Sequence, residues 1–95
     1  MSPTHNLYRI MHFVYLLKSL KDNTLYLGCT SNLKKRIIEH NQGKADYSQK
    51  HIPWKLVYFE GYYSKTDAFG REQKLKLHAQ GMRRLKDRLQ HSLSV

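Results

Sequence analysis

The stretch that decides the fold is Phe13-Val14-Tyr15-Leu16-Leu17, which is followed after a polar turn by Leu25-Tyr26-Leu27-Gly28. Both runs are short, apolar and rich in residues that favour strands. Asp22-Asn23 lies between them and is typical of a turn. The two runs therefore predict a β-hairpin. Its loop, residues 19–23, is longer than a two-residue turn, so the turn type stays open.

A helix is predicted directly after the hairpin. Thr30-Ser31-Asn32 provides three possible N-caps, and residues 33–42 form an amphipathic segment with Leu33 and Ile37 one turn apart. Gly43 stands where a helix commonly ends. The polar residues 44–51 that follow predict a loop.

The rest of the sequence predicts one more strand and two more helices. Residues 54–60 are apolar and aromatic, which favours a strand. Residues 64–67 begin the second helix, Gly81 is expected to end it, and apolar residues within 82–89 recur at helical spacing. The order β-β-α-β-α-α predicts an α/β (α+β) sandwich, with helices flanking a three-stranded, mostly antiparallel sheet.

The length of 95 residues suits one domain. We expect an irregular N-terminal leader over residues 1–11, the single domain over 12–90 and a C-terminal tail over 91–95. An aromatic content of 12% argues against disorder and for a compact core.

Charge dominates the composition. Seventeen Lys and Arg oppose seven Asp and Glu, which gives a net charge of +10 at pH 7 with His neutral. Such an excess opposes compaction through self-repulsion, so a polyanionic partner is the economical explanation. Nucleic acid is the favoured partner, DNA ahead of RNA, although basic chains also bind membrane surfaces and acidic proteins.

The single cysteine, Cys29, excludes an intrachain disulfide and a zinc site built from cysteines, and it suits a reducing compartment. No apolar stretch approaches the roughly 20 residues that a membrane helix needs. The N-terminal residues lack the apolar run of a signal peptide. We therefore expect a cytoplasmic protein with no membrane and no disulfide-linked partner, and the oligomeric state stays open.

Five residues could carry hydrolytic chemistry. Tyr15 and Tyr26 lie on the two strands of the predicted hairpin, and Arg36 and His40 share one face of the first helix. Glu72 lies on a later helix. Phosphodiester hydrolysis needs a carboxylate for a hard cation, a guanidinium for phosphate charge and a base near the attacking water.

These residues belong to a larger ordered set that resembles the GIY-YIG nucleases, in particular their small stand-alone bacterial members. Phe13-Val14-Tyr15 stands where the family has G-I-Y, and Tyr26-Leu27-Gly28 where it has Y-I-G. The resemblance continues along residues 12–86 through the following segments: Thr30-Ser31-Asn32-Leu33-x-x-Arg36, Glu39-His40-Asn41-x-Gly43-Lys44, Pro53-Trp54-Lys55-Leu56-Val57-Tyr58 and Ala68-x-x-Arg71-Glu72-x-x-Leu75-Lys76.

The resemblance implies a metal-dependent endonuclease and a role for each matching residue. Tyr15 and Tyr26 would flank the attacking water, one of them as general base, with Tyr15 preferred. Arg36 would bind the scissile phosphate, and His40 would support the phosphate or the base. Glu72 would be the single protein ligand of one divalent cation, Mg²⁺ or Mn²⁺. Phe13 departs from the glycine of the motif.

The basic residues around these positions are expected to bind the nucleic-acid backbone. They are Lys35, Arg36, Lys44, Arg71, Lys76, Arg83 and Arg84. The main alternative is a non-catalytic nucleic-acid-binding module of the same fold, which would explain the net charge equally well. A third possibility is an adaptor whose basic face binds an acidic protein.

Each site residue also has a purely structural interpretation. Tyr15 and Tyr26 are common types of core or cross-strand residue. Arg36 is suited to an ion pair with Glu39, and Glu72 to an ordinary helical ion pair. Trp54 and Cys29 are expected to be a core anchor and a small, buried or half-buried residue. Each structural interpretation is sound for its residue alone. The resemblance, however, places all five site residues in one site, and this joint placement favours a functional role.

Overall fold

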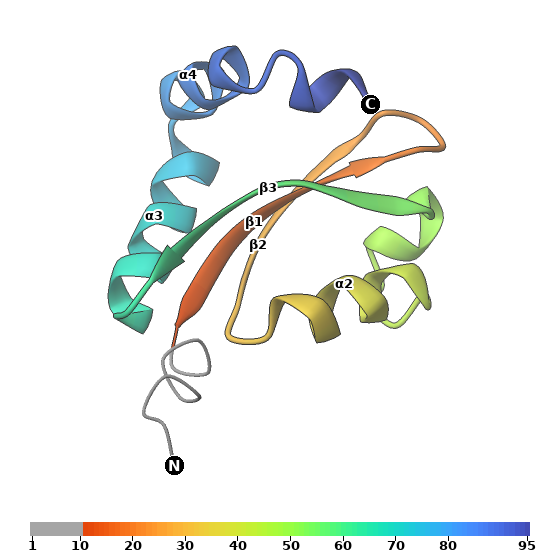
Figure 1. Cartoon of the computed structure of the whole chain (residues 1–95), viewed down its shortest axis with the longest axis horizontal. Helices are drawn as coiled ribbons and strands as arrows, with labels where there is room; N and C mark the ends of the chain where they lie inside the picture. The colour runs from red at the N-terminus through yellow and green to blue at the C-terminus, as the bar shows by residue number, and fades with distance from the viewer. Residues whose placement is uncertain (1–10) are drawn as a thin grey trace.

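In a computed structural model, which describes residues 11–95, the chain folds as the sequence predicts (Figure 1). The elements are β1 (His12–Ser19), β2 (Leu25–Thr30), α2 (Leu33–Asn41), β3 (Trp54–Tyr62), α3 (Lys65–Leu77) and α4 (Ala79–Arg88). Short 3₁₀ turns cover Ser48–His51 and Ser92–Ser94. The predicted leader, residues 1–11, lies outside the described residues except for Met11.

The three strands form one antiparallel sheet in the order β2-β1-β3. β1 is therefore the central strand, and its register places Tyr15 opposite Gly28 of β2 and Phe59 of β3. Paired residues share a face of the sheet. Tyr15 therefore lies between β2 and β3 on the central strand.

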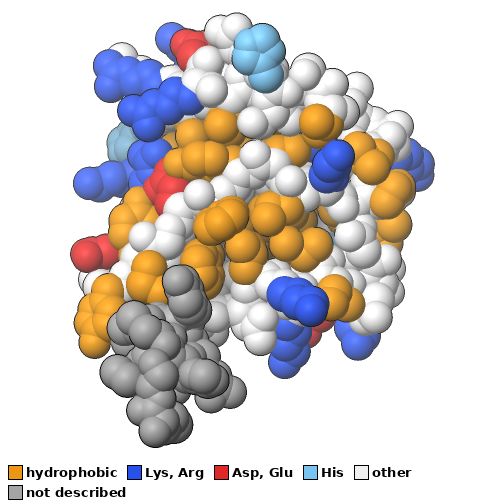
Figure 2. Space-filling view, in the orientation of Figure 1, with side chains coloured by type: hydrophobic (Ala, Val, Ile, Leu, Met, Phe, Trp, Pro, Cys, Tyr) orange, Lys and Arg blue, Asp and Glu red, His pale blue; other side chains and the backbone are white. Residues whose placement is uncertain are grey.

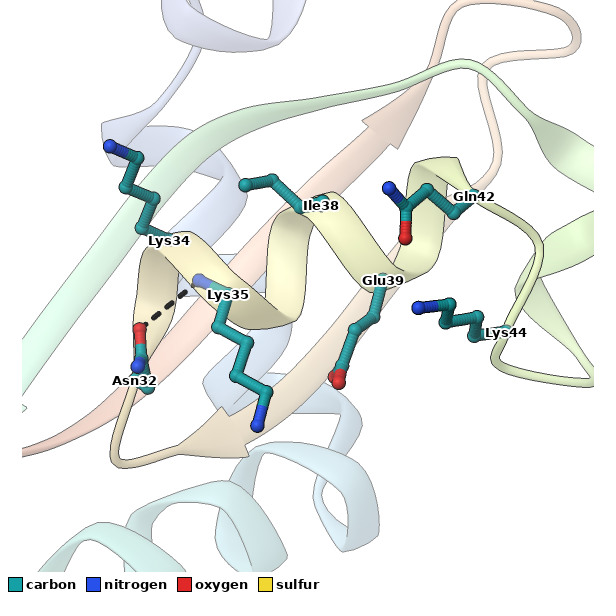
Figure 3. A pocket seen from close by; sticks show the side chains of 7 residues that line it. All are labelled: Asn32, Lys34, Lys35, Ile38, Glu39, Gln42 and Lys44. Atoms are coloured by element: carbon teal, nitrogen blue, oxygen red, sulfur yellow. Dashed lines mark hydrogen bonds between the residues drawn. The ribbon is translucent and has the colours of Figure 1, made fainter.

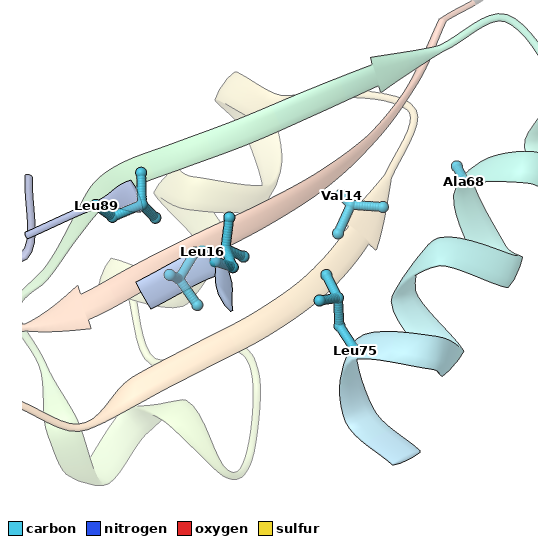
Figure 4. Close-up of a cluster of buried hydrophobic side chains, with 6 residues drawn as sticks. Val14, Leu16, Ala68, Leu75 and Leu89 are labelled. Carbon is cyan, nitrogen blue, oxygen red and sulfur yellow. The ribbon is translucent and has the colours of Figure 1, made fainter. Parts of the chain in front are cut away.

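Helices cover the two faces of the sheet in different ways (Figure 1). α3 and α4 pack on the face to which Val14 and Leu16 point, whereas α2 packs on the face of Tyr15 and Leu17. The first core joins strand and helix residues in one layer (Figure 4): Val14, Leu16, Ala68, Leu75, Leu85 and Leu89. β1 is buried on both faces, which is why its run is continuously apolar.

Local signals placed the ends of α2 well. Asn32, one of the three candidate N-caps, accepts a hydrogen bond from the Lys35 amide at 3.1 Å. Gly43 follows the helix with φ +76°, a left-handed conformation that glycine adopts at little cost. Asn23 in the hairpin turn also has a positive φ of 66°.

The prediction that Gly81 ends the second helix was wrong. α3 stops at Leu77, His78 is extended, and Gly81 lies inside the first turn of α4. The burial of α3 ends at Leu75, and Leu77 is 72% exposed, so the chain turns here to return Leu85 to the core. β3 is longer than predicted by two residues.

One face of the sheet is only partly covered by α2. Phe59 is 51% exposed and packs edge-to-face on Phe13 with ring centroids 5.8 Å apart. Hydrophobic atoms gather in the middle of the face drawn in Figure 2, with Lys and Arg side chains toward its margins. No helix in residues 11–95 has the length and apolar character needed to span a membrane.

Gly28 is the position at which strand pairing leaves least room. A Cβ added there would lie 2.5 Å from Tyr15 Cζ and would overlap the phenol oxygen as well. Because Tyr15 is buried, Gly28→Ala is expected to lower the free energy of unfolding by about 1–3 kcal/mol, measured by urea denaturation.

Gly70 offers a matched control for that substitution. It lies inside α3, and a Cβ added there would meet no other atom within 4 Å. Gly70→Ala should therefore raise the free energy of unfolding, by up to about 1 kcal/mol, through better helix propensity. Equal effects of the two substitutions would contradict the close approach of Tyr15 to Gly28.

Candidate active site

Tyr15 is at the centre of the candidate site. It lies in the middle of β1, exposes 1% of its surface and lays its ring over Gly28. Its hydroxyl lies 2.9 Å from Nε2 of His40, which α2 brings to the same layer of the core. Tyr15 and His40 are 25 residues apart in sequence, so this contact exists only in the folded chain.

His40 is held from its other side by Ser48. His40 Nδ1 lies 2.7 Å from Ser48 Oγ, and that hydroxyl donates its own proton to the Ala45 carbonyl at 3.1 Å. Ser48 Oγ therefore accepts from His40, which places the imidazole proton on Nδ1 and leaves Nε2 as the acceptor for Tyr15. The result is a directed chain of hydrogen bonds from Tyr15 through His40 to Ser48.

Burial shifts both titratable groups of this chain toward their neutral forms. It raises the pKa of Tyr15 to about 12, against the opposing influence of the Arg36 guanidinium beside the phenol. Burial, together with the positive charge of Arg36, lowers the pKa of His40 below its usual value. The imidazole is thus a neutral acceptor near pH 7.

Tyr26 forms the wall of the site next to His40. Its ring centroid lies 4.6 Å from that of His40 and 6.2 Å from that of Tyr15. On its outer side it stacks on Tyr47, with centroids 6.1 Å apart and the rings tilted by 29°. Tyr47 is 57% exposed, so the aromatic stack runs from the core to the surface.

Arg36 lies one helical turn before His40 and reaches the same place. Its Nη1 donates to Glu39 Oε1 at 3.2 Å, as its structural interpretation predicted, and its side chain is 35% exposed. Arg36 also interacts with the phenol of Tyr15, which raises the pKa of the guanidinium. Glu39 thus orients Arg36 beside the buried phenol.

Glu72 approaches from the opposite face of the sheet. It is 7% exposed, and its Oε2 pairs with Lys76 Nζ at 2.9 Å. Glu72 lines a hollow together with Cys29 and Thr30, so it lies beside β2. Burial raises the pKa of Cys29, and the negative charge of Glu72 adds to that shift. Cys29 itself is half-buried, as expected.

A hollow of about 350 Å³ opens in front of the Glu72 carboxylate. Its lining residues are His12, Cys29, Thr30, Ser31, Lys65, Phe69 and Glu72. In residues 11–95 no three His, Cys, Asp or Glu side chains come together as a metal cage. Mg²⁺ suits such a place, because it keeps several waters and binds through one or two carboxylates plus substrate phosphate.

A second hollow, of about 310 Å³, runs along the outer side of α2. Lys34, Lys35 and Lys44 line it together with Glu39, and Figure 3 shows Lys35 and Glu39 extending from the same stretch of the helix. Glu39 also binds Arg36, so this groove adjoins the site. Lys35 and Lys44, both predicted to bind nucleic acid, thus share one surface.

The other basic residues predicted to bind nucleic acid lie elsewhere. Lys76 is the partner of Glu72, and Arg71 forms an ion pair with Glu60 at 2.9 Å. Arg83 and Arg84 are exposed on α4. The structure therefore divides the predicted set among the α2 groove, the Glu72 carboxylate and the α4 helix.

Sequence reasoning missed several residues of the site. Ser48 and Tyr47 lie in the segment predicted as a plain loop, and no spacing rule links them to His40 or Tyr26. His12 and Lys65 also line the hollow at Glu72; His12 is 60 residues from Glu72 in the sequence, whereas Lys65 lies two turns before it on α3. The i, i+7 spacing of Lys65 and Glu72 on one helix could have indicated Lys65, but only the contacts of the folded chain reveal the other three.

Known proteins are similar to this chain in both sequence and fold. The family described as the GIY-YIG catalytic domain matches residues 11–85, a span that includes all five predicted site residues. The chain belongs to the GIY-YIG family. GIY-YIG domains define a nuclease superfamily, and the match thus confirms the resemblance on which the functional prediction rests.

The GIY-YIG relatives include small proteins named UPF0213. One from Clostridium perfringens is 49% identical over 67 residues, 70% of this chain and 71% of its own. One from Natronomonas pharaonis is 42% identical over 66 residues, 68% of this chain and 76% of its own. The solution NMR structure of the UPF0213 protein BH0048 from Bacillus halodurans matches with a TM-score of 0.51 and 33% identity, over 81% of this chain and 83% of that one.

The neutral state of His40 predicts a pH dependence of stability. The pKa of His40 is lower in the folded chain than the roughly 6.5 of an unfolded histidine, so the unfolded state binds more protons in acid. This contribution is complete above pH 6.5 and is lost as pH falls through the folded pKa. Between pH 8 and pH 5 it amounts to at most about 2 kcal/mol.

Urea denaturation at the two pH values measures this contribution. His40→Gln is expected to weaken the loss of stability on acidification, whereas His78→Gln, at an exposed histidine, should leave it unchanged. If all three proteins lost the same free energy between pH 8 and pH 5, the neutral, buried state of His40 would be ruled out.

Proposed function

We propose that this protein is an endonuclease that hydrolyses phosphodiester bonds of DNA with the help of one divalent cation. The observation that carries the proposal is the hydrogen-bonded chain from Tyr15 through His40 to Ser48, which lies beside the guanidinium of Arg36. Family membership supports the reaction class. The residue roles below are our own assignment.

The general base is Tyr15 acting together with His40. Forming a free phenolate from a group of pKa about 12 costs about 7 kcal/mol at pH 7, so phenolate alone is a poor base here. The hydrogen bond to His40 Nε2 offers another route. As the phenol oxygen takes a proton from the attacking water, its own proton passes to Nε2, and Tyr15 stays neutral throughout.

His40 is the final acceptor of that proton. Burial lowers its pKa and so weakens it as an acceptor, but the relay avoids forming a phenolate on the buried Tyr15, whose pKa is raised to about 12. Ser48 accepts the Nδ1–H bond and keeps the imidazole in the required tautomer. Tyr26, packed on His40, is assigned to the wall that orients water and substrate.

Arg36 is assigned to the scissile phosphate. Glu39 fixes its guanidinium beside Tyr15, so a phosphate bound there would lie next to the water that Tyr15 activates. A guanidinium stabilises the charge that grows on phosphate oxygens during attack. Lys35 and Lys44 in the adjoining groove extend the positive surface along the backbone of the substrate.

Glu72 is assigned as the single protein ligand of Mg²⁺ or Mn²⁺. Its carboxylate faces a hollow with room for water molecules. It already binds one cation, the ammonium group of Lys76, so an anionic oxygen suited to a hard metal ion is present here. A bound cation would supply stabilisation of the leaving oxygen.

The nuclease test compares Glu72→Gln and Tyr15→Phe with the wild type. Labelled single-stranded, double-stranded and branched DNA and RNA are incubated with Mg²⁺, Mn²⁺ or EDTA. Cleavage should need the metal, and each substitution should slow it by about a hundredfold or more, since it removes the ligand or the proton acceptor. DNA is expected to be cut in preference to RNA.

Two controls make the result specific. Tyr63 is 74% exposed, and Tyr63→Phe should leave the rate unchanged. Binding in EDTA should be equal for wild type and Tyr15→Phe. Binding without metal-dependent cleavage on any substrate would replace the nuclease by the non-catalytic module, which the burial of Tyr15 and the Lys76–Glu72 pair would also suit.

The Lys76–Glu72 pair predicts the metal affinity. A cation that binds Glu72 must displace the ammonium group of Lys76, which lies 2.9 Å away and is 47% exposed. Partly exposed pairs of this kind are worth about 0.2–1 kcal/mol. Lys76→Gln should therefore tighten Mn²⁺ binding by up to about fivefold, measured by electron paramagnetic resonance of free Mn²⁺.

Lys74→Gln removes the same charge from α3 without touching Glu72 and is the matched control. It should change Mn²⁺ affinity less than Lys76→Gln does. Equal affinities for both variants would mean that Glu72 is not the metal ligand.

A further inference from the structure

α3 and α4 enclose a hollow of about 230 Å³ that takes no part in the site described above. Its lining residues are Arg71, Gly81, Arg84, Leu85 and Arg88, so three of the five carry guanidinium groups and none is acidic. Figure 2 shows Lys and Arg side chains gathered over the part of the molecule where α3 and α4 lie in Figure 1.

The packing of α4 fixes the side of the helix on which two of these arginines lie. Leu85 and Leu89 are 2% and 8% exposed and hold one side of the helix against the core. Arg84 and Arg88 stand one helical turn apart, hence on the same side of the helix, and both line the hollow. Two like charges at this spacing repel each other, so an anion between them would relieve an unfavourable arrangement.

Arg71 is oriented by Glu60, the only acidic residue in residues 11–95 that forms an ion pair with an arginine of this hollow. Its Nε and Nη2 donate to the carboxylate of Glu60 at 2.9–3.2 Å, and Glu60 also accepts hydrogen bonds from the hydroxyls of Tyr58 and Tyr62. Glu60 is therefore saturated and balances one positive charge of three. In residues 11–95, Nη1 of Arg71 has no hydrogen-bond partner and can donate to another acceptor.

Arg84 and Arg88 have no acidic partner within 4.0 Å in residues 11–95, a range that contains all seven acidic residues of the chain. Asp87, on the same helix, forms no ion pair with either of them. The hollow thus carries two guanidinium charges that the described part of the chain leaves uncompensated.

We propose that this hollow is a second phosphate-binding site, which holds a backbone phosphate of the nucleic acid away from the bond that is cleaved. Planar guanidinium groups pair with phosphate oxygens through parallel hydrogen bonds, and three of them around one hollow match a tetrahedral anion better than they match a single carboxylate. The assignment to a nucleic-acid backbone rests on the proposed function, whereas phosphate chemistry alone would also fit a small free phosphate.

The position of the hollow says how such a strand would run. Arg71 and Glu72 are neighbours on α3, yet Arg71 points to β3 and Glu72 to the hollow beside β2. β1 lies between these two strands, which sets them about 10 Å apart. A nucleic-acid strand bound both at this hollow and at the hollow beside Glu72 would cross α3. The phosphate held by the arginines would then set the position of the phosphate near Glu72 without any contact to a base.

The test compares two double variants that remove the same charge from α4. Arg84→Ala with Arg88→Ala empties the hollow of its two unpaired arginines. Arg83→Ala with Lys86→Ala removes two exposed basic side chains of the same helix that do not line the hollow. The affinity of a labelled oligonucleotide is measured in EDTA over a range of salt concentrations, and melting temperatures verify that both variants are folded.

The Arg84/Arg88 double variant is expected to bind the oligonucleotide about tenfold more weakly than the wild type at low salt. The slope of log affinity against log salt should also fall by about 0.7–0.9, the value of one lost phosphate contact. The Arg83/Lys86 variant should lose at most about twofold to threefold. Arg84→Lys, which keeps the charge but not the fork, should lie between wild type and the Arg84/Arg88 double variant. Equal affinities and slopes for the two double variants would overturn the site.

Two further outcomes separate the possible ligands and functions. In the first, pyrophosphate raises the melting temperature of the wild type but not that of the Arg84/Arg88 variant, while both proteins bind the oligonucleotide equally. That result would overturn the nucleic-acid assignment in favour of a small phosphate. Oligonucleotide binding that depends on Arg84 and Arg88 in a protein that cleaves nothing would support this site while removing the proposed nuclease function.

Discussion

The hydrogen bond between Tyr15 and His40 is the interaction on which the arrangement of the site depends. A phenol and an imidazole are buried in one layer of the core, and a buried polar group without a partner costs about 1–3 kcal/mol. Tyr15 satisfies Nε2 of His40 and Ser48 satisfies Nδ1, so no buried side-chain nitrogen or oxygen in residues 11–95 lacks a partner. This requirement holds β1, α2 and the turn at Ser48 in one arrangement. The contacts that stabilise the core are therefore the same contacts that align the groups of the proposed reaction.

The edge position of β2 brings groups from the two faces of the sheet close to the same strand. Tyr15 and its partners lie on the face of α2, while Glu72 lies on the face of α3. A central strand would separate them, but β2 is at the edge of the sheet formed by residues 11–95. The phenol of Tyr15 extends over Gly28 of that strand, and Glu72 lines a hollow with Cys29 and Thr30 of the same strand. Because Gly28 has no side chain, the phenol of Tyr15 can lie directly against β2 at this point, which gives a physical reason for the glycine in the motif.

Patterns confined to one element could be predicted from the sequence, and contacts between elements could not. The strands were evident from apolar runs, and the end of α2 from Gly43, because strand propensity and a left-handed φ are properties of a few adjacent residues. The break at His78 was missed because it depends on where α4 must turn to bury Leu85, which no local signal records. The grouping of Tyr15, Arg36 and Glu72 was predicted through the resemblance alone. Ser48 escaped notice because its role is set by a side chain eight residues away, across a loop.

The acidic residues of this chain orient its arginines more than they neutralise them. Of seven carboxylates, Glu39 and Glu60 each hold one guanidinium in a fixed direction, next to Tyr15 in one case and on the hollow of α4 in the other. Each such pair neutralises one positive charge but holds the guanidinium group in one orientation. A guanidinium that is already ordered loses less side-chain entropy when it binds a phosphate. The net charge of +10 remains to attract a polyanion over long range, with an affinity that falls as salt rises. Long-range attraction alone would leave a bound strand free to slide. In the function proposed here, the oriented arginines would therefore decide which phosphate lies beside Tyr15.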